Sequence, residues 1–192
     1  MKGSSLLAAA FMAAALAACQ GARAERPVAP VSHVDLLRYM GSWYVIASIP
    51  TRFERNEYNP VETYHLQADG SICTSFRFRE GGFDAPLKKI HSVATVVTGT
   101  GNAEWRVHLF WLLRAQYIVA WLAPDYSAVI VARDARDYMW MMARTPQIPT
   151  DEYRRMLMKV QAMGYDLSRV RKSPQRWPEA GVSSRSFGDS CR

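Results

Sequence analysis

Alternating apolar and polar positions divide the middle of the chain into short segments. Within residues 74–79 two phenylalanines alternate with two arginines, and residues 105–109 show the same period of two. Since every second residue of a strand points to the same face, this pattern predicts antiparallel strands with one buried and one solvated face. Eight strands are predicted, over residues 43–49, 62–66, 72–79, 89–97, 105–111, 116–122, 128–132 and 139–144.

Turn signals rich in Gly, Asn, Asp and Pro lie between these segments. They occur at residues 59–60, 69–70, 81–82, 99–102, 124–126 and 134–137. Short strands at such regular spacing are typical of a β-sandwich or a closed β-barrel. The predicted fold class is therefore all-β.

A helical period follows the last strand. Thr150 is the expected N-cap, and Asp151 and Glu152 in the first turn favour the positive end of the helix dipole. Gly164 is expected to end the helix. The apolar residues on its one buried face are Tyr153, Met156, Leu157, Val160 and Met163. This pattern predicts one helix packed on the outside of the sheet.

The first 18 residues have the composition of an export signal. Lys2 precedes an Ala-rich apolar run that is too short to span a membrane. The run ends in Leu16-Ala17-Ala18-Cys19, which is similar to the lipobox of bacterial lipoproteins, whose cysteine carries diacylglycerol and an acylated amino group. The alternative is a plain Ala-x-Ala cleavage site beside an uninvolved Cys19. Gln20, in place of an Asp, favours the outer membrane, with the protein facing the periplasm.

The rest of the chain divides by composition. Residues 19–34 are small, polar and Pro-containing, which predicts a lipid-anchored tether. Residues 35–172 have the size of a single domain. Residues 173–192 are rich in Ser, Arg and Pro, which predicts a disordered tail.

Three further motifs link the predicted barrel to a known protein family. They are Gly41-x-Trp43 at the first strand, Asp125-Tyr126 before the seventh, and Arg144 at the end of the eighth. With these motifs the chain, over about residues 33–172, resembles the lipocalin family. Within the family it is similar to the bacterial outer-membrane lipoprotein lipocalins at residues 43–44, 52–55, 64, 137–140, 144–146 and 164–168. The resemblance implies an eight-stranded up-and-down antiparallel barrel. It also implies that Arg144 packs over Trp43 to close the barrel floor.

Alternate residues of a strand point to the same face, so counting along the strands from Trp43 and Arg144 predicts which residues point into the barrel. Barrels of this size hold one small ligand. The expected lining is apolar and aromatic, which suits a fatty acid, a lysophospholipid or a similar amphipathic lipid held for storage, transport or membrane maintenance. The predicted ligand-binding residues are Val45, Ala47, Phe76, Phe78, Val107, Leu109, Trp111, Tyr117, Val119, Trp121, Trp140 and Met142.

Connections alternate between the two ends of such a barrel, so those after strands one, three, five and seven share the open end. They carry basic residues mixed with acids. The fifth connection also places apolar residues 111–113 beside Arg114. This combination predicts that the open end docks on anionic lipid. The alternative is a solvated rim over a folded-in loop. The basic residues are Arg52, Arg55, Lys88, Arg114, Arg133 and Arg136.

Enzyme motifs are absent from the sequence. It holds no Gly-x-Ser-x-Gly, His-Glu-x-x-His, phosphate loop or dinucleotide fingerprint, and its four histidines are scattered singly. No cofactor and no metal site are expected. Cys73 is open to two interpretations, as a nucleophile of a lipid-processing enzyme or as the partner of Cys191 in a disulfide that ties the tail to the barrel. An exported compartment permits such a disulfide.

The expected partners follow from the export signal. The net charge of +7 fits anionic lipid headgroups, since an exported protein does not meet nucleic acid. The main expectation is a non-enzymatic lipid-binding protein held in the outer membrane through Cys19. A lipocalin-fold enzyme acting through Cys73 or a carboxylate, and a scaffold with an occluded core, are the alternatives. The sequence leaves open the identity of the ligand and whether the chain forms a homodimer.

Overall fold

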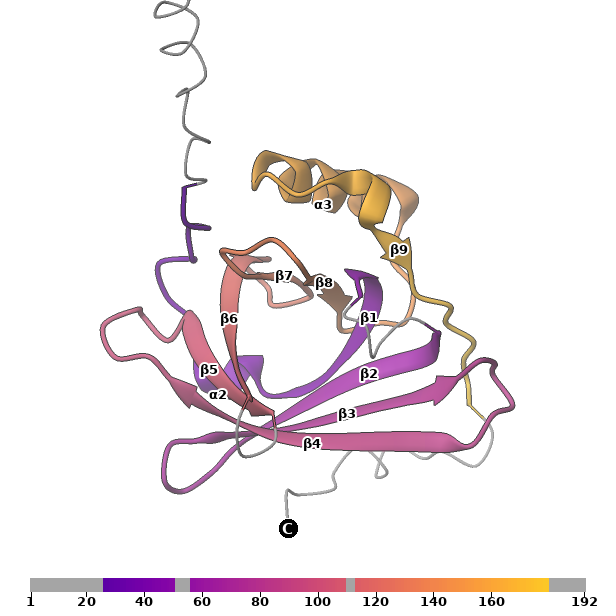
Figure 1. Ribbon diagram of the computed structural model, residues 1–192, viewed down its shortest axis with the longest axis horizontal. Helices are drawn as coiled ribbons and strands as arrows, with labels where there is room; N and C mark the ends of the chain where they lie inside the picture. Colours follow the sequence, from indigo (N-terminus) through magenta and orange to yellow (C-terminus); the bar gives the residue numbers. More distant parts are fainter. Residues whose placement is uncertain (1–25, 51–55, 110–112, 180–192) are drawn as a thin grey trace, which may run out of the picture.

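The computed structural model describes residues 26–50, 56–109 and 113–179 (Figure 1). Within them one antiparallel sheet follows the chain order from β2 to β8 and then β1, and a further pairing of β2 with β1 closes it. The prediction of a closed eight-stranded up-and-down barrel is confirmed. The strands are β1 (Gly41–Ile49), β2 (Glu57–Leu66), β3 (Ile72–Glu80), β4 (Leu87–Val96), β5 (Glu104–Leu109), β6 (Leu113–Leu122), β7 (Ala128–Ala132), β8 (Met139–Ala143) and β9 (Arg171–Lys172).

The largest error in strand boundaries is in β2, which begins at Glu57, five residues before the predicted start. Asn59-Pro60 was expected to be a turn between strands. Instead Asn59 has a φ of +49°, and the β2–β3 register shifts between Tyr58 and Val61. A bulge absorbs the irregular backbone there, so the strand bends and continues.

Two α-helices lie in the described residues. The short α2 (Leu36–Tyr39) precedes β1, and the Asp35 carboxylate accepts a hydrogen bond from Arg38 N at its start. The longer α3 (Thr150–Ala162) lies outside the barrel (Figure 1). Its N-cap is Pro149, without a side-chain cap, so the prediction of Thr150 as N-cap is wrong by one residue. Neither helix is long and apolar enough to cross a bilayer.

Buried apolar side chains form two clusters on opposite faces of the sheet. The interior cluster receives residues from all eight barrel strands, among them Trp43, Phe76 and Tyr117. The outer cluster joins β1, β6, β7 and β8 to α3, where Met156 and Val160 are buried. The predicted apolar face of the helix is therefore packed against the barrel wall.

Two register shifts reverse the alternation between these faces. The β1–β8 ladder shifts between Val45 and Ala47, and the β6–β7 ladder shifts between Val119 and Trp121. Val45 and Val119 are in the interior cluster, whereas Ala47 and Trp121 are in the outer cluster. The prediction that Ala47 and Trp121 point into the barrel is wrong, because one extra residue moves every later side chain to the other face.

The C-terminal segment continues the barrel wall beyond the predicted domain. After the turn of η2 (Leu167–Arg169), β9 pairs with the second half of β1, where β1 no longer pairs with β2. Ser173 N donates to Ile46 O over 2.9 Å, and Asn59 N donates to Pro174 O over 2.9 Å. Residues 173–179, predicted to begin a disordered tail, thus fill the seam between β1 and β2.

Candidate functional site

The barrel floor is built on Trp43, which is fully buried. The Arg144 guanidinium carbon lies 3.7 Å from the centroid of the Trp43 ring, a cation–π contact. The same guanidinium donates to Ser42 O at 2.9 Å, Arg38 O at 2.8 Å and Tyr39 O at 3.0 Å. Arg144 therefore fastens the end of β8 to α2 and to the start of β1, as predicted for this pair.

Gly41 is favoured by its backbone conformation, since a Cβ would fit beside Arg144 in ordinary contact. It has a φ of +89°, and a Cβ built on it would lie 3.5 Å from Arg144 Nη1. An L side chain at that φ would be strained.

Asp125 and Tyr126 hold the neighbouring closed-end turn. Asp125 accepts from Ser127 N at 3.0 Å, and the Tyr126 hydroxyl accepts from Asp35 N at 2.9 Å. The Arg38 guanidinium carbon lies 4.0 Å from the centroid of the Tyr126 ring. Asp125 and Tyr126 are thus structural residues at the floor, away from the open end.

A chain of three tyrosine hydroxyls lies above the floor. Tyr117 Oη is 2.7 Å from Tyr39 Oη and donates to Tyr64 Oη at 3.0 Å. Trp105 stacks parallel on Tyr117 with ring centroids 4.5 Å apart. Burial raises the pKa of all three tyrosines above the ordinary value, so they remain neutral hydrogen-bonding groups. Tyr117 is therefore part of the packed lower core.

The remaining predicted residues of the interior lie at two levels. Phe76, Phe78, Val107 and Trp140 are toward the open end, whereas Val45, Val119 and Met142 are nearer the floor. Val45, Phe76, Phe78, Val119 and Met142 are buried in the interior cluster, and Val107 and Trp140 lie at its edge. The Phe76 and Phe78 rings stack at 5.1 Å. Trp111 and the side chain of Leu109 lie outside the described residues.

The interior wall is open to solvent at β4. Ile90 lies opposite Phe76 in the β3–β4 ladder, so both side chains are on the interior face, yet Ile90 is 36% exposed. Nearer the floor, Ser92 and Ala94 on the same face are buried. An exposed apolar residue on an interior face marks the space that a ligand could fill.

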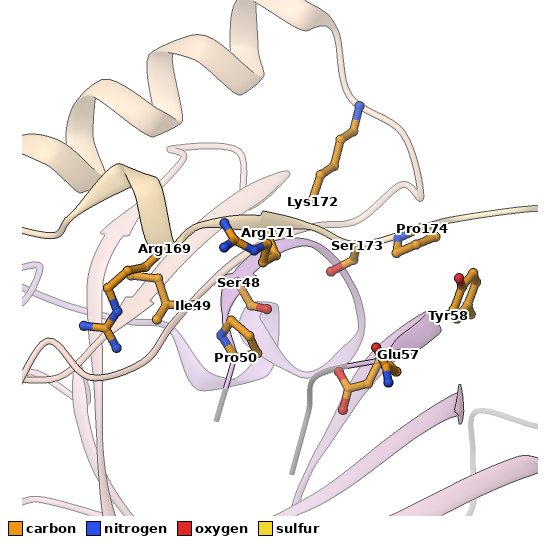
Figure 2. A pocket seen from close by; sticks show the side chains of 11 residues that line it. Ser48, Ile49, Pro50, Glu57, Tyr58, Arg169, Arg171, Lys172, Ser173 and Pro174 are labelled. Carbon is orange, nitrogen blue, oxygen red and sulfur yellow. The ribbon is translucent and has the colours of Figure 1, made fainter. Parts of the chain in front are cut away.

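A second opening lies beside the seam, between the end of β1 and the start of β2 (Figure 2). Its volume is about 550 Å³. Arg169 and Arg171 line one side, and Glu57 and Tyr58 line the other. Within the part of the chain that the structure describes, neither arginine forms a salt bridge; Arg169 donates to Asp137 O, and Arg171 to Ser168 O.

Comparison with known proteins agrees with this geometry. Residues 34–175 match the lipocalin-like domain family. The chain belongs to the lipocalin family.

This lipocalin is 31% identical over 167 residues to the outer membrane lipoprotein Blc of Escherichia coli K12, covering 85% of this chain and 92% of Blc. It is 28% identical over 151 residues to temperature-induced lipocalin-1 of Arabidopsis thaliana, covering 76% and 81% of the two chains. Insecticyanin of the tobacco hornworm Manduca sexta has the same fold. Its TM-score is 0.62 at 16% identity, over 81% of this chain and 88% of that one.

Cys73 of this lipocalin lies on the outer face of β3 and is disulfide-bonded. The residue is fully buried, and its partner cysteine lies outside the described residues. Its sulfur is therefore not available as a thiolate. No group of three or more His, Cys, Asp or Glu residues converges in the described ranges to hold a metal ion.

Strand parity from the sequence missed several residues of this lipocalin's interior. Trp105 shares its face with Val107 and could have been found by extending the parity of β5 by one step. Ile90 and Glu62 lie opposite Phe76 on β4 and β2, and only the ladder registers place them inside. Tyr39 precedes the first strand, where no alternation exists to assign it.

Proposed function

We propose that this lipocalin binds one amphipathic lipid, a fatty acid or a lysophospholipid, in the upper half of its barrel for storage, transport or membrane maintenance. The observation that carries this proposal is the solvent-exposed Ile90 on the interior face, opposite buried Phe76. An acyl chain that covers this surface gains about 0.8 kcal/mol for each buried methylene. Binding is by reversible enclosure.

The head of the lipid remains near the open end. The opening beside the seam places the Arg169 and Arg171 guanidiniums next to apolar Ile49, Pro50 and Tyr58. Arg169 and Arg171 donate to backbone carbonyls and form no salt bridge among the described residues, so either can pair with a phosphate or a carboxylate; Glu57 on the far side of the opening is the one acid that lines it. This arrangement fits an anionic or zwitterionic head above a buried chain.

We place the protein at the outer membrane, anchored by lipid on Cys19. Support comes from the lipobox-like residues 16–19, from Gln20 after the cysteine, and from the relatives that carry the name outer membrane lipoprotein Blc. Two or three acyl chains on one cysteine suffice for stable anchoring.

The binding role is favoured over a lipid-processing enzyme. The enzyme alternative assigns the nucleophile to Cys73, but that sulfur is in a disulfide and faces away from the interior. The enzyme alternative would then need a catalytic carboxylate, and Glu62 lies on the interior face opposite Phe76. Turnover of a bound lysophospholipid that stops in Glu62→Gln would favour the enzyme.

The test compares two residues on opposite faces of β4. Ile90 is 36% exposed on the interior face, and Val93 is 40% exposed on the outer face. In a titration with a fluorescent fatty acid, Ile90→Glu is expected to weaken binding at least tenfold, because the lipid would have to bury a carboxylate. Val93→Glu, which introduces the same charge on the outer face, should bind like the wild type. Equal affinities in the two variants would mean that the lipid does not enter the barrel.

A further inference from the structure

The N-terminal segment, residues 26–34, forms hydrogen bonds with connections at both ends of the barrel. At its start, Arg26 O accepts a 2.7 Å hydrogen bond from Arg136, and Val28 N donates over 2.7 Å to Asp134. Asp134 and Arg136 belong to the connection between β7 and β8, at the open end. At its finish, Val34 N donates to Gly101 O over 2.8 Å, in a turn of the closed end.

This segment is fixed to the barrel from its first described residues. Val28 is 5% exposed and packs into the outer cluster, and Val31 N donates to Val119 O of β6 over 2.9 Å. Arg136 also donates to Met163 O, which ties the same connection to the end of α3. The tether predicted for residues 19–34 is therefore bound to the barrel wall from residue 26 onward.

The remaining length limits how far the open end can lie from an anchor at Cys19. Seven residue steps separate Cys19 from Arg26, and a fully extended chain spans at most about 25 Å over that length. The closed end lies a whole barrel length further away. A lipid on Cys19 would thus keep the open end within about 25 Å of the bilayer surface.

The distribution of surface charge also favours the open end as the end that faces the membrane. Arg114, Arg169 and Arg171 near the open end form no salt bridge in the described part of the chain. The closed-end turns at residues 67–71, 97–103 and 123–127 hold the acids Asp69 and Asp125 and no Lys or Arg. Arg38 and Arg144 also lie at the closed end, where their guanidiniums pack on the Tyr126 and Trp43 rings and donate to backbone carbonyls. An anionic leaflet attracts the open-end arginines and repels Asp69 and Asp125.

We propose that the open end of the barrel docks on the anionic surface of the bilayer in which Cys19 is anchored. The partner is the lipid surface itself, and the inference rests on the proposed lipidation of Cys19. In this orientation a lipid passes between the leaflet and the barrel interior with little exposure of its acyl chain to bulk water. The fixed course of residues 26–34 places the start of the described chain, the end nearer Cys19, at the open end of the barrel.

Hydrogen exchange measured by mass spectrometry tests the orientation. The lipidated full-length protein is compared on and off vesicles of phosphatidylethanolamine mixed with phosphatidylglycerol. Amides in the open-end connections, residues 81–86 and 133–138, are expected to exchange more slowly on vesicles, while residues 67–71 and 97–103 at the closed end do not change. Protection at the closed end, or equal protection at both ends, overturns the orientation alone. A full-length chain that does not sediment with vesicles overturns the anchor and the orientation together.

A pair of double variants tests the contribution of charge. Arg114→Glu with Arg171→Glu reverses two cations near the open end, and Arg106→Glu with Arg154→Glu reverses two exposed cations on the barrel side and on α3. At low salt the first pair should at least halve the open-end protection, and the control pair should retain it. The difference should shrink as salt rises, because exposed charges are screened over about 10 Å at 0.1 M. Equal protection in the two double variants would contradict docking on anionic lipid.

Discussion

Removing the Arg144 side chain tests the floor of the barrel. Its guanidinium donates three hydrogen bonds of 2.8–3.0 Å to the carbonyls of α2 and β1 and lies 3.7 Å from the Trp43 ring centroid. A hydrogen bond from a charged donor contributes about 1.5–3 kcal/mol, and a cation–π contact about 0.5–2 kcal/mol. The sum overstates the loss, because water can reach the exposed carbonyl of Arg38. We expect Arg144→Ala to lower the free energy of unfolding by about 2–4 kcal/mol.

Urea unfolding followed by circular dichroism measures this loss. Arg144→Lys should recover only part of it, since one ammonium cannot bind three carbonyls and cover the indole at once. Arg106→Ala removes an exposed arginine of β5 and should stay within about 0.5 kcal/mol of the wild type. An Arg144→Ala protein as stable as Arg106→Ala would refute the claim that this residue fastens the floor.

Three further predictions concern the anchor, the seam and the tyrosine chain. Cys19→Ser should move the protein from the outer-membrane fraction to the soluble periplasm or leave it unprocessed, and wild-type fractionation would contradict the anchor. Burial raises the pKa of Glu179, but the hydrogen bonds and charges of Arg79 and Arg77 outweigh burial and the pKa is lowered. The stability that Glu179 contributes is therefore present above its ordinary pKa and is lost as the pH falls through the lower folded value. The difference in unfolding free energy between wild type and Glu179→Gln should be constant near neutral pH and shrink in acid, and a pH-independent difference would contradict the ion pair. Tyr117→Phe should lower the free energy of unfolding in urea by about 1–2 kcal/mol, because it removes the hydroxyl between Tyr39 and Tyr64. An unchanged unfolding midpoint would mean that the hydrogen bonds among the three tyrosines do not stabilise the fold.

The barrel could be predicted from the sequence because apolar and polar residues alternate along its strands and Gly, Asn, Asp and Pro mark the turns between them. Trp43 and Arg144 were expected to meet, and they do, since the first strand begins and the eighth strand ends at the same end of such a barrel. Parity then placed Phe76, Phe78 and Met142 correctly. It failed at Ala47 and Trp121, because a bulge leaves no mark in the alternation of a strand that is buried on both faces.

The C-terminal segment was missed for a different reason. Composition describes residues 173–179 as polar and Pro-rich, but their order comes from partners about 100 residues away. Glu179 is buried between Arg77 and Arg79, and Trp177 packs edge-on against Tyr44 at 5.1 Å. A tryptophan in an otherwise polar tail was the one local signal of packing. Residues 180–192, the rest of the predicted tail, lie outside the described residues.

Native mass spectrometry of the full-length protein purified from cells, combined with extraction of its lipids, tests the central claim most directly. We expect one amphipathic lipid with an acyl chain per barrel. That lipid should be retained in Val93→Glu and lost in Ile90→Glu. A folded barrel that carries no lipid, and takes up neither fatty acid nor lysophospholipid when these are added, would contradict it.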